Sequence, residues 1–298
     1  MPASHRILLT GTNSYIASHI LSQLLATKNY SVRAVVRSQS KVDAIKALLP
    51  NASAQQLDFA VVPDITVANA FDTALQSSPR FDTVMHTSSP ILFSAAASRV
   101  ARDDVKSVII TSSFAAVGFH PNEEPGKVYT EDDWNPVTLS QVEAAWAEDI
   151  KDPAYLASKT FAEPAAWDFV EERKAEVKWD FVTLNPPMVY GPLAHKISSL
   201  AKLSESTGHI YKGFFATKTP TDALPPDGLA LYVDVRDLTT AHISAMEVAE
   251  AGNQRFGICG REFRSQELAD LFRNDLPGVE ARVPKGRPGD VNKDGTRM

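Results

Sequence analysis

Short apolar runs alternate with amphipathic stretches along the first half of the chain. The apolar runs that predict strands fall at residues 7–10, 32–36, 57–62, 82–86 and 108–111. Segments with the apolar spacing of helices separate the first four runs, at residues 16–26, 42–49 and 67–75. Uninterrupted apolar strands spaced by helices are typical of a parallel sheet covered on both faces. Because crossovers between parallel strands are right-handed, this pattern predicts a doubly wound sheet.

The second half continues this alternation but contains a long irregular segment. We expect a long helix at residues 153–176, a strand at 181–184, a further strand at 231–235 and a helix at 238–249. Residues 191–228 are rich in Ser, Thr, Pro and Lys, which is typical of a substrate-facing insertion. The predicted fold class is therefore α/β, a doubly wound parallel (Rossmann) sheet with a smaller C-terminal substrate-binding lobe.

Composition and charge exclude several classes of partner. The formal net charge is −6 and no basic stripe stands out, so we expect no nucleic-acid partner. No apolar run approaches the length of a membrane span, and we expect no membrane association. The chain has one cysteine, Cys259, and its histidines lack metal spacing, so we predict no metal site. The short N-terminus lacks the regions of a signal peptide, which predicts a cytoplasmic protein.

The segment TGTNSYIA, residues 10–17, follows the first strand and opens the first helix. A turn of this kind brings backbone N–H groups and a helix N-terminus against a pyrophosphate. Gly11 suits the tight bend, and Ala17 is small enough for packing of the helix on the strand. Ser14 stands where a second glycine is usual and adds a Cβ where a dinucleotide should pass. The alternative is a strand–turn–helix without a ligand. The predicted dinucleotide contacts are Gly11, Ser14, Tyr15 and Ile16.

The end of the second strand predicts which dinucleotide is bound. An NAD site carries an acidic residue here, which accepts a hydrogen bond from the ribose 2′-hydroxyl. This chain has Arg37 instead, with Lys41 close behind, and a guanidinium is suited to a 2′-phosphate. We therefore predict NADPH, against the alternative of a solvated basic pair. Asp64, at the end of the third strand, is placed to accept a hydrogen bond from the adenine amino group. Alternatively, it caps the following predicted helix.

Tyr155 and Lys159 are four residues apart near the start of the long predicted helix, so they share one helix face. An ammonium beside a phenol favours the phenolate and should lower the tyrosine pKa, which allows proton transfer near neutral pH. Such a spacing also arises by chance on amphipathic helices. The fifth strand ends at Ser112 and Ser113, where ligands bind in open α/β sheets. Ser113 could hold a carbonyl there, although both serines could instead cap a helix or form a turn.

Together these motifs resemble the extended short-chain dehydrogenases/reductases, in the branch of dihydroflavonol reductases and fungal aldehyde and methylglyoxal reductases. The resemblance implies that Tyr155 donates a proton, that Lys159 binds the nicotinamide ribose and tunes the tyrosine, and that Ser113 hydrogen-bonds the carbonyl. It also implies NADPH as cofactor and places a segment containing Pro186 and Val189 under the nicotinamide. The matching stretches are residues 8–19, 33–38, 62–66, 86–90, 108–117, 155–167, 185–192 and 232–242.

The predicted activity is NADPH-dependent reduction of the carbonyl of a small-molecule aldehyde or ketone. We assign the NADP-binding domain to residues 1–190 and 229–260, and the substrate lobe to residues 191–228 and 261–298. The tail after about residue 286 carries almost no apolar side chains and should be mobile.

Two other functions stay open at this level. One is an NAD-dependent sugar-nucleotide epimerase or dehydratase, which would need an acid in place of Arg37. The other is a cofactor-binding protein that has lost turnover. Ser14, a link of only residues 91–105 between the fourth and fifth strands, and an early C-terminal end all depart from the family pattern. The short link can form only about two turns of the helix that, in the resembling family, often builds the dimer interface, so we do not expect the usual dimer.

Overall fold

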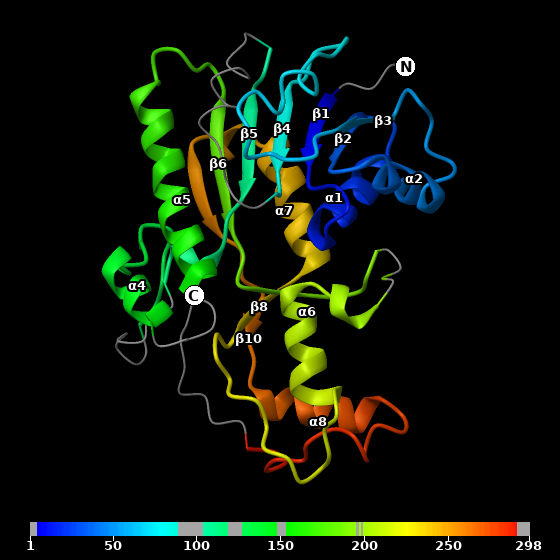
Figure 1. Ribbon diagram of the computed structural model, residues 1–298, viewed down its shortest axis with the longest axis vertical. Coiled ribbons are helices and arrows are strands. Elements are labelled where there is room, and N and C mark those ends of the chain that lie inside the picture. The colour runs from blue at the N-terminus through cyan, green and yellow to red at the C-terminus, as the bar shows by residue number, and fades with distance from the viewer. Residues whose placement is uncertain are drawn as a thin grey trace.

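Seven parallel strands form the central sheet (Figure 1). The structure is a computed structural model that describes residues 5–88, 104–118, 127–147, 153–194, 197 and 199–290. Because the strand order reverses between β1 and β4, a crevice for ligands is expected beyond the carboxyl ends of the strands. In spatial order the strands are β3 (Leu57–Val61), β2 (Tyr30–Val36), β1 (His5–Thr10), β4 (Thr83–His86), β5 (Ser107–Thr111), β6 (Asp180–Asn185) and β9 (Gln254–Gly257).

Helices cover both faces of this sheet. One face packs against α1 (Tyr15–Leu25), α2 (Gln39–Leu48) and α7 (Val235–Glu247), and the other against α5 (Pro153–Glu172) (Figure 1). The alternation of side chains along a strand explains this division. Ile7 and Leu9 of β1 join the core under α1, whereas Leu8 joins the core under α5. A short helix, α4 (Leu139–Ala147), packs beside α5.

A smaller lobe lies beyond the carboxyl ends of the central strands (Figure 1). Its sheet has three strands, β10 (Arg261–Glu262), β8 (Leu231–Asp234) and β7 (Met188–Tyr190). Two helices complete it, α6 (Glu205–Ile210), which continues as a π turn over Tyr211–Phe215, and α8 (Ser265–Asp275). Phe214, Ala269 and Val283 form its buried core. The lobe thus places residues that are distant in sequence opposite the strand ends.

The predicted helix at residues 67–75 is wrong. Residues 65–75 form a series of turns, and Asn69 has a positive φ of 66°. Asp64 accepts hydrogen bonds from the backbone N–H of Thr66 at 2.8 Å and from its hydroxyl at 2.6 Å. Such local bonds between side chain and backbone compete with helix formation. The segment therefore crosses the sheet face as turns.

The structure agrees with some of the other predicted segments and differs from others. Residues 191–228 were expected to be irregular, but they contain α6 and its π turn. The strand expected at 231–235 exists as β8, and it pairs in the small sheet. Most of the link at 91–105 and the tail after residue 290 lie outside the described residues. Within the described ranges, no helix is both long and apolar enough to cross a bilayer, and no cluster of His, Cys, Asp and Glu is arranged to hold a metal ion.

Candidate active site

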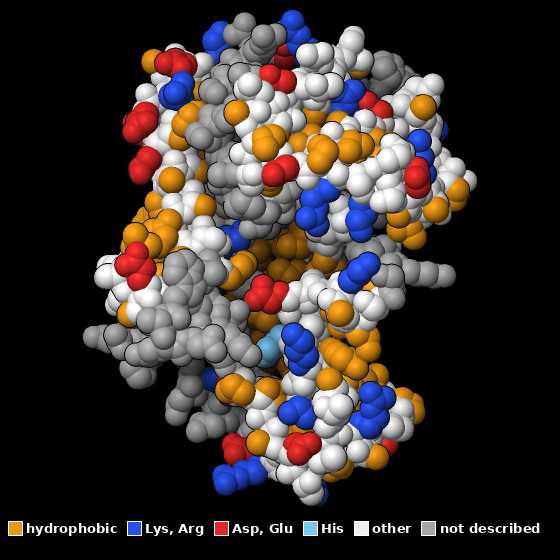
Figure 2. Space-filling model, viewed as in Figure 1, with side chains coloured by type: hydrophobic (Ala, Val, Ile, Leu, Met, Phe, Trp, Pro, Cys, Tyr) orange, Lys and Arg blue, Asp and Glu red, His pale blue; other side chains and the backbone are white. Residues whose placement is uncertain are grey.

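A cavity of about 400 Å³ opens at the carboxyl ends of β1, β5 and β6. Figure 2 shows a hollow between the central sheet and the smaller lobe, with hydrophobic side chains on its floor. Its walls come from the turn before α1, the first turns of α5, and residues 193, 197, 202 and 204–206. The sequence-predicted site residues that line it are Ser14, Tyr15, Ile16, Ser113, Tyr155, Lys159, Pro186 and Val189.

Three polar side chains meet in this cavity. The hydroxyl of Tyr155 donates a hydrogen bond to Oγ of Ser113 at 3.2 Å. Nζ of Lys159 lies 5.9 Å from the centre of the Tyr155 ring, and only 6% of Lys159 is exposed. Ser113 also accepts a bond from the backbone N–H of Ala115 at 3.2 Å, so it caps the short 3₁₀ helix Phe114–Ala116 as well. The cap fixes the serine rotamer and leaves its hydroxyl facing the tyrosine.

The expected lowering of the Tyr155 pKa is wrong. Burial raises the pKa of this phenol, the hydrogen bond with Ser113 lowers it by less, and the carboxylate of Glu205 raises it further. Burial also lowers the pKa of Lys159, and the carboxylate of Glu163 opposes that effect. Desolvation disfavours the charged form of both groups. Tyr155 therefore keeps its proton at neutral pH.

The turn before α1 is built around Gly11. Its φ is +66°, and a Cβ at this position would lie 2.8 Å from Oγ1 of Thr87 and 2.9 Å from Oγ of Ser88. Ser14 closes the turn with an N–H bond to the Gly11 carbonyl at 2.8 Å, and its own backbone is extended, with φ −84° and ψ 169°. Any residue adopts that conformation, so the backbone does not require a glycine at position 14. No side chain caps α1, which leaves its first N–H groups for an anion.

The remaining predicted cofactor residues lie outside this cavity. Arg37 is exposed at the end of β2, beside the Gly11 turn on β1, and Lys41 lies on α2. Neither lines the cavity. Asp64 is also absent from its walls, and its carboxylate is occupied by Thr66, whose hydrogen bonds lower its pKa. Asp64 thus forms a local turn, close to the capping alternative, and its contact with the adenine amino group stays a prediction.

Comparison with known proteins decides the family. No protein-family model matches the chain. It is 31% identical to the NADPH-dependent methylglyoxal reductase GRE2 of Saccharomyces cerevisiae, with 95% of this chain and 86% of the relative covered. It is 34% identical to the ketoreductase azaE of Aspergillus niger, with 97% of this chain and 87% of the relative covered. The chain belongs to the extended short-chain dehydrogenases/reductases, in the methylglyoxal reductase branch.

The solved structures agree with this membership. Yeast methylglyoxal/isovaleraldehyde reductase Gre2 complexed with NADPH matches this short-chain reductase with a TM-score of 0.82 and 29% identity. The match covers 98% of this chain and 90% of that one. The family resemblance that the sequence motifs indicate and the predicted fold class are therefore confirmed.

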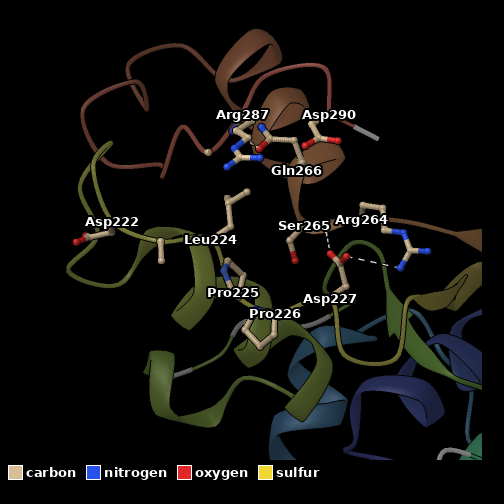
Figure 3. A pocket seen from close by; sticks show the side chains of 12 residues that line it. Asp222, Leu224, Pro225, Pro226, Asp227, Arg264, Ser265, Gln266, Arg287 and Asp290 are labelled. Carbon is tan, nitrogen blue, oxygen red and sulfur yellow. Dashed lines mark hydrogen bonds and ion pairs between the residues drawn. The ribbon is translucent and has the colours of Figure 1, made fainter. Parts of the chain in front are cut away.

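A second cavity of about 450 Å³ lies within the smaller lobe of this short-chain reductase (Figure 3). Its polar groups bond mainly to one another. Asp227 accepts from the N–H of Ser265 at 2.6 Å and lies 3.6 Å from Arg264, while Gln266 accepts from the N–H of Arg287 at 2.6 Å. None of the predicted site residues lines it. The first cavity, which the predicted residues line, is therefore the candidate active site.

Two buried groups beside the site were not among the predicted site residues: His86, which the sequence places at a strand end near the cofactor in a structural role, and Glu163, which sequence reasoning missed. His86, at the end of β4, shares a hydrogen bond with Thr10 at 3.0 Å between Nδ1 and Oγ1. Burial and the charge of Lys159 lower the pKa of His86 to about 4, so it is neutral. The other is Glu163, on the same helix as Tyr155 and 1% exposed. Its spacing of four residues from Lys159 was the available signal, but a glutamate on a helix is usually exposed.

Proposed function

We propose that Tyr155, Ser113 and Lys159 carry out carbonyl reduction in this NADP-dependent oxidoreductase. The observation that carries the proposal is the bond of 3.2 Å between Tyr155 and Ser113, with buried Lys159 alongside, in the cavity at the strand ends. Ligands of doubly wound sheets bind at this edge. The related proteins are named as reductases of methylglyoxal, of isovaleraldehyde and of ketones, which supports a carbonyl substrate.

The turn before α1 fits the diphosphate of NADPH. Gly11 makes room that a Cβ would fill, and the uncapped N-terminus of α1 presents N–H groups. Arg37, exposed beside this turn, would pair with the 2′-phosphate, with Lys41 in support. Pro186 and Val189 line the cavity and would contact the nicotinamide. When bound, NADPH supplies the hydride that is added to the carbonyl carbon.

The protein's own residues supply the proton. Ser113 and Tyr155 would hold the carbonyl oxygen with their hydroxyls, and Tyr155 would transfer its phenolic proton to that oxygen. The O–H bond of the tyrosine breaks, the O–H bond of the alcohol forms, and a phenolate remains. The ammonium of Lys159, on the same helix face, stabilises that phenolate. Burial keeps the phenol protonated until a substrate accepts the proton.

The cavity favours a small and largely apolar substrate. Its volume of about 400 Å³ must hold the nicotinamide as well as the substrate. Leu193 and Ile197 add apolar surface on the wall formed by the smaller lobe. We therefore propose short aldehydes and ketones as substrates.

One assay separates this proposal from its two rivals. Purified protein is mixed with NADPH or NADH and a panel of aldehydes and ketones, and absorbance of the reduced cofactor is followed. We expect turnover with NADPH and several short carbonyl compounds. Tight binding of NADPH without turnover on any member of the panel would indicate a cofactor-binding protein. Activity on nucleotide sugars with NAD would indicate the epimerase or dehydratase function, which the exposed Arg37 at the end of β2 disfavours.

A further inference from the structure

A buried carboxylate joins the catalytic helix to two strands of the central sheet and to the residue that follows a third strand. Glu163 lies on α5 and is 1% exposed. Its Oε1 accepts from the hydroxyl of Thr183 on β6 at 3.0 Å and from Nε of Arg255 on β9 at 2.8 Å. Its Oε2 accepts from the hydroxyl of Ser112, directly after β5, at 2.5 Å and from Nδ2 of Asn185 on β6 at 2.5 Å. Four donors thus fix both oxygens of one side chain.

Stability alone does not explain this arrangement. Burying a charge is costly, and a buried ion pair often contributes no more stability than apolar side chains of similar volume. Glu163 lies on α5 among side chains that pack well without charge, such as Ala166 and Val170. A carboxylate with four donors specifies geometry more sharply than apolar packing does.

Both donors to Oε2 of Glu163 are directly linked to Ser113. Ser112 is the chain neighbour of Ser113, and Asn185 also donates from Nδ2 to the carbonyl of Ser113 at 3.2 Å. Glu163 therefore holds the backbone of Ser113 from two sides. Since Tyr155 and Glu163 lie on one helix, the same carboxylate sets the distance from the Tyr155 hydroxyl to Oγ of Ser113, which is 3.2 Å.

Glu163 also sets the charge around Lys159. Tyr155, Lys159 and Glu163 follow one another at intervals of four residues on α5, so they share one face. The carboxylate favours the ammonium form of Lys159 and opposes the effect of burial on its pKa.

Three further titratable groups face Tyr155, Lys159 or Glu163 in the described part of the chain. Glu205, on α6, lines the cavity with Tyr155 and raises the pKa of its phenol. Arg255, from β9, stacks on Trp134 with its Cζ 3.5 Å from the ring centre and bonds to the carbonyl of Asp133 at 2.9 Å. His86, from β4, interacts with Lys159 and is neutral, with its pKa lowered to about 4.

We propose that Glu163 is a positioning residue for the reduction, which fixes Ser113 against the catalytic helix and keeps a negative charge beside Lys159. The proposal rests on the catalytic roles proposed for Tyr155 and Lys159. Glu163 itself does not line the cavity, so it acts through its neighbours.

Two variants separate geometry from charge. Glu163→Asp keeps the charge but shortens the side chain, so kcat should fall about 10- to 100-fold while the alkaline limb of the pH profile of kcat/KM stays in place. Glu163→Gln removes the charge that favours the ammonium of Lys159, so Lys159 should lose its proton at lower pH. Its kcat should fall by a similar factor, and the alkaline limb should shift to lower pH. Thermal melting is recorded for both variants.

Asp58→Asn is the matched control. Like Glu163, Asp58 has a carboxylate that is bonded to arginine, in this case to Arg6 at 2.6 Å and to Arg33 at 2.6 Å. Asp58 lies on β3, however, and outside the active-site cavity. This variant should lower the melting temperature, keep kcat within about twofold of the wild type and leave the alkaline limb unmoved.

Three outcomes would overturn the proposal. One is a kcat within threefold of the wild type in both Glu163 variants. The second is an alkaline limb that stays in place in Glu163→Gln, because that outcome leaves only a structural role. If Glu163→Gln does not fold, a kcat of Glu163→Asp equal to that of Asp58→Asn overturns the proposal equally. Tyr155→Phe is measured in parallel. Full activity of that variant would refute the proposed chemistry, whereas its loss together with normal Glu163 variants would refute only this inference.

Discussion

Replacing Tyr155 with phenylalanine tests the proposed chemistry with a minimal change. The substitution removes one oxygen and its hydrogen bond of 3.2 Å to Ser113, and it leaves the ring in place. Tyr155 as a whole residue is 39% exposed and the bond is between neutral groups, so the free energy of unfolding should fall by at most about 1 kcal/mol. For a chain of this length, that change lowers the melting temperature by only a few degrees.

The effect on turnover should be far larger. Loss of a general acid costs about 10²–10⁴-fold in rate, and each factor of ten corresponds to about 1.4 kcal/mol of activation free energy. The barrier should therefore rise by roughly 3–5 kcal/mol, which exceeds the change in stability several-fold. NADPH oxidation with the best aldehyde of the panel measures kcat. Quenching of protein fluorescence by NADPH should give an unchanged dissociation constant, because the hydroxyl and not the ring is lost.

Ser158→Ala provides the control on the same helix. The Ser158 hydroxyl is exposed and bonds to the backbone carbonyl of Tyr155 at 2.7 Å, so its removal leaves the cavity intact. Its kcat should stay within about twofold of the wild type. The mechanism would be wrong if Tyr155→Phe retained more than half of the wild-type rate on a good substrate.

Three further substitutions or conditions test other parts of the site. Arg37→Asp should weaken NADPH binding about tenfold or more in a fluorescence titration, since charge-assisted bonds contribute roughly 1.5–3 kcal/mol, and equal dissociation constants would contradict the assignment. Gly11→Ala should lower the melting temperature and weaken NADPH binding, because its methyl group would lie 2.8 Å from Oγ1 of Thr87 at a φ of +66°, and unchanged values of both would refute that reasoning. His86 and His242 are buried, and their pKa values of about 4 lie below the unfolded value of 6.5. Because the unfolded chain binds more protons between these pKa values, the free energy of unfolding should fall as pH drops from about 6.5 to 4, by up to roughly 3 kcal/mol per histidine. Chemical denaturation at a series of pH values measures this change, and a free energy of unfolding that does not vary with pH would contradict the reasoning.

Local patterns in the sequence were sufficient for much of the fold and the candidate site. The first apolar runs became β1 to β5, because uninterrupted apolar strands are buried in a parallel sheet. Gly11 could be assigned to the tight turn because the motif around it is continuous in sequence, and the structure gives it a positive φ. Tyr155 and Lys159 could be paired because helix geometry fixes residues four apart on one face.

Other features depended on contacts between distant segments. Residues 67–75 have the apolar spacing of a helix, yet local bonding by Asp64 and the course of the chain across the sheet produce turns. The pKa of Tyr155 moves opposite to the expectation from Lys159, since burial depends on the smaller lobe and the strand ends around it. Sequence spacing gives the neighbours along one helix but not the amount of water that the folded protein removes.

The sequence by itself determined the parallel sheet, the turn around Gly11 and the placement of Tyr155 and Lys159 on one helix face, since each depends on residues close together in the chain. Only the tertiary structure decided that Glu163 is buried and bonded to groups from β6 and β9 and to Ser112 directly after β5, and that β7, β8 and β10 form a separate sheet. The partners of Glu163 at positions 112, 183, 185 and 255 are 20 to 92 residues away from it. A buried charge is stable only where such distant donors converge, and their convergence is a property of the folded chain.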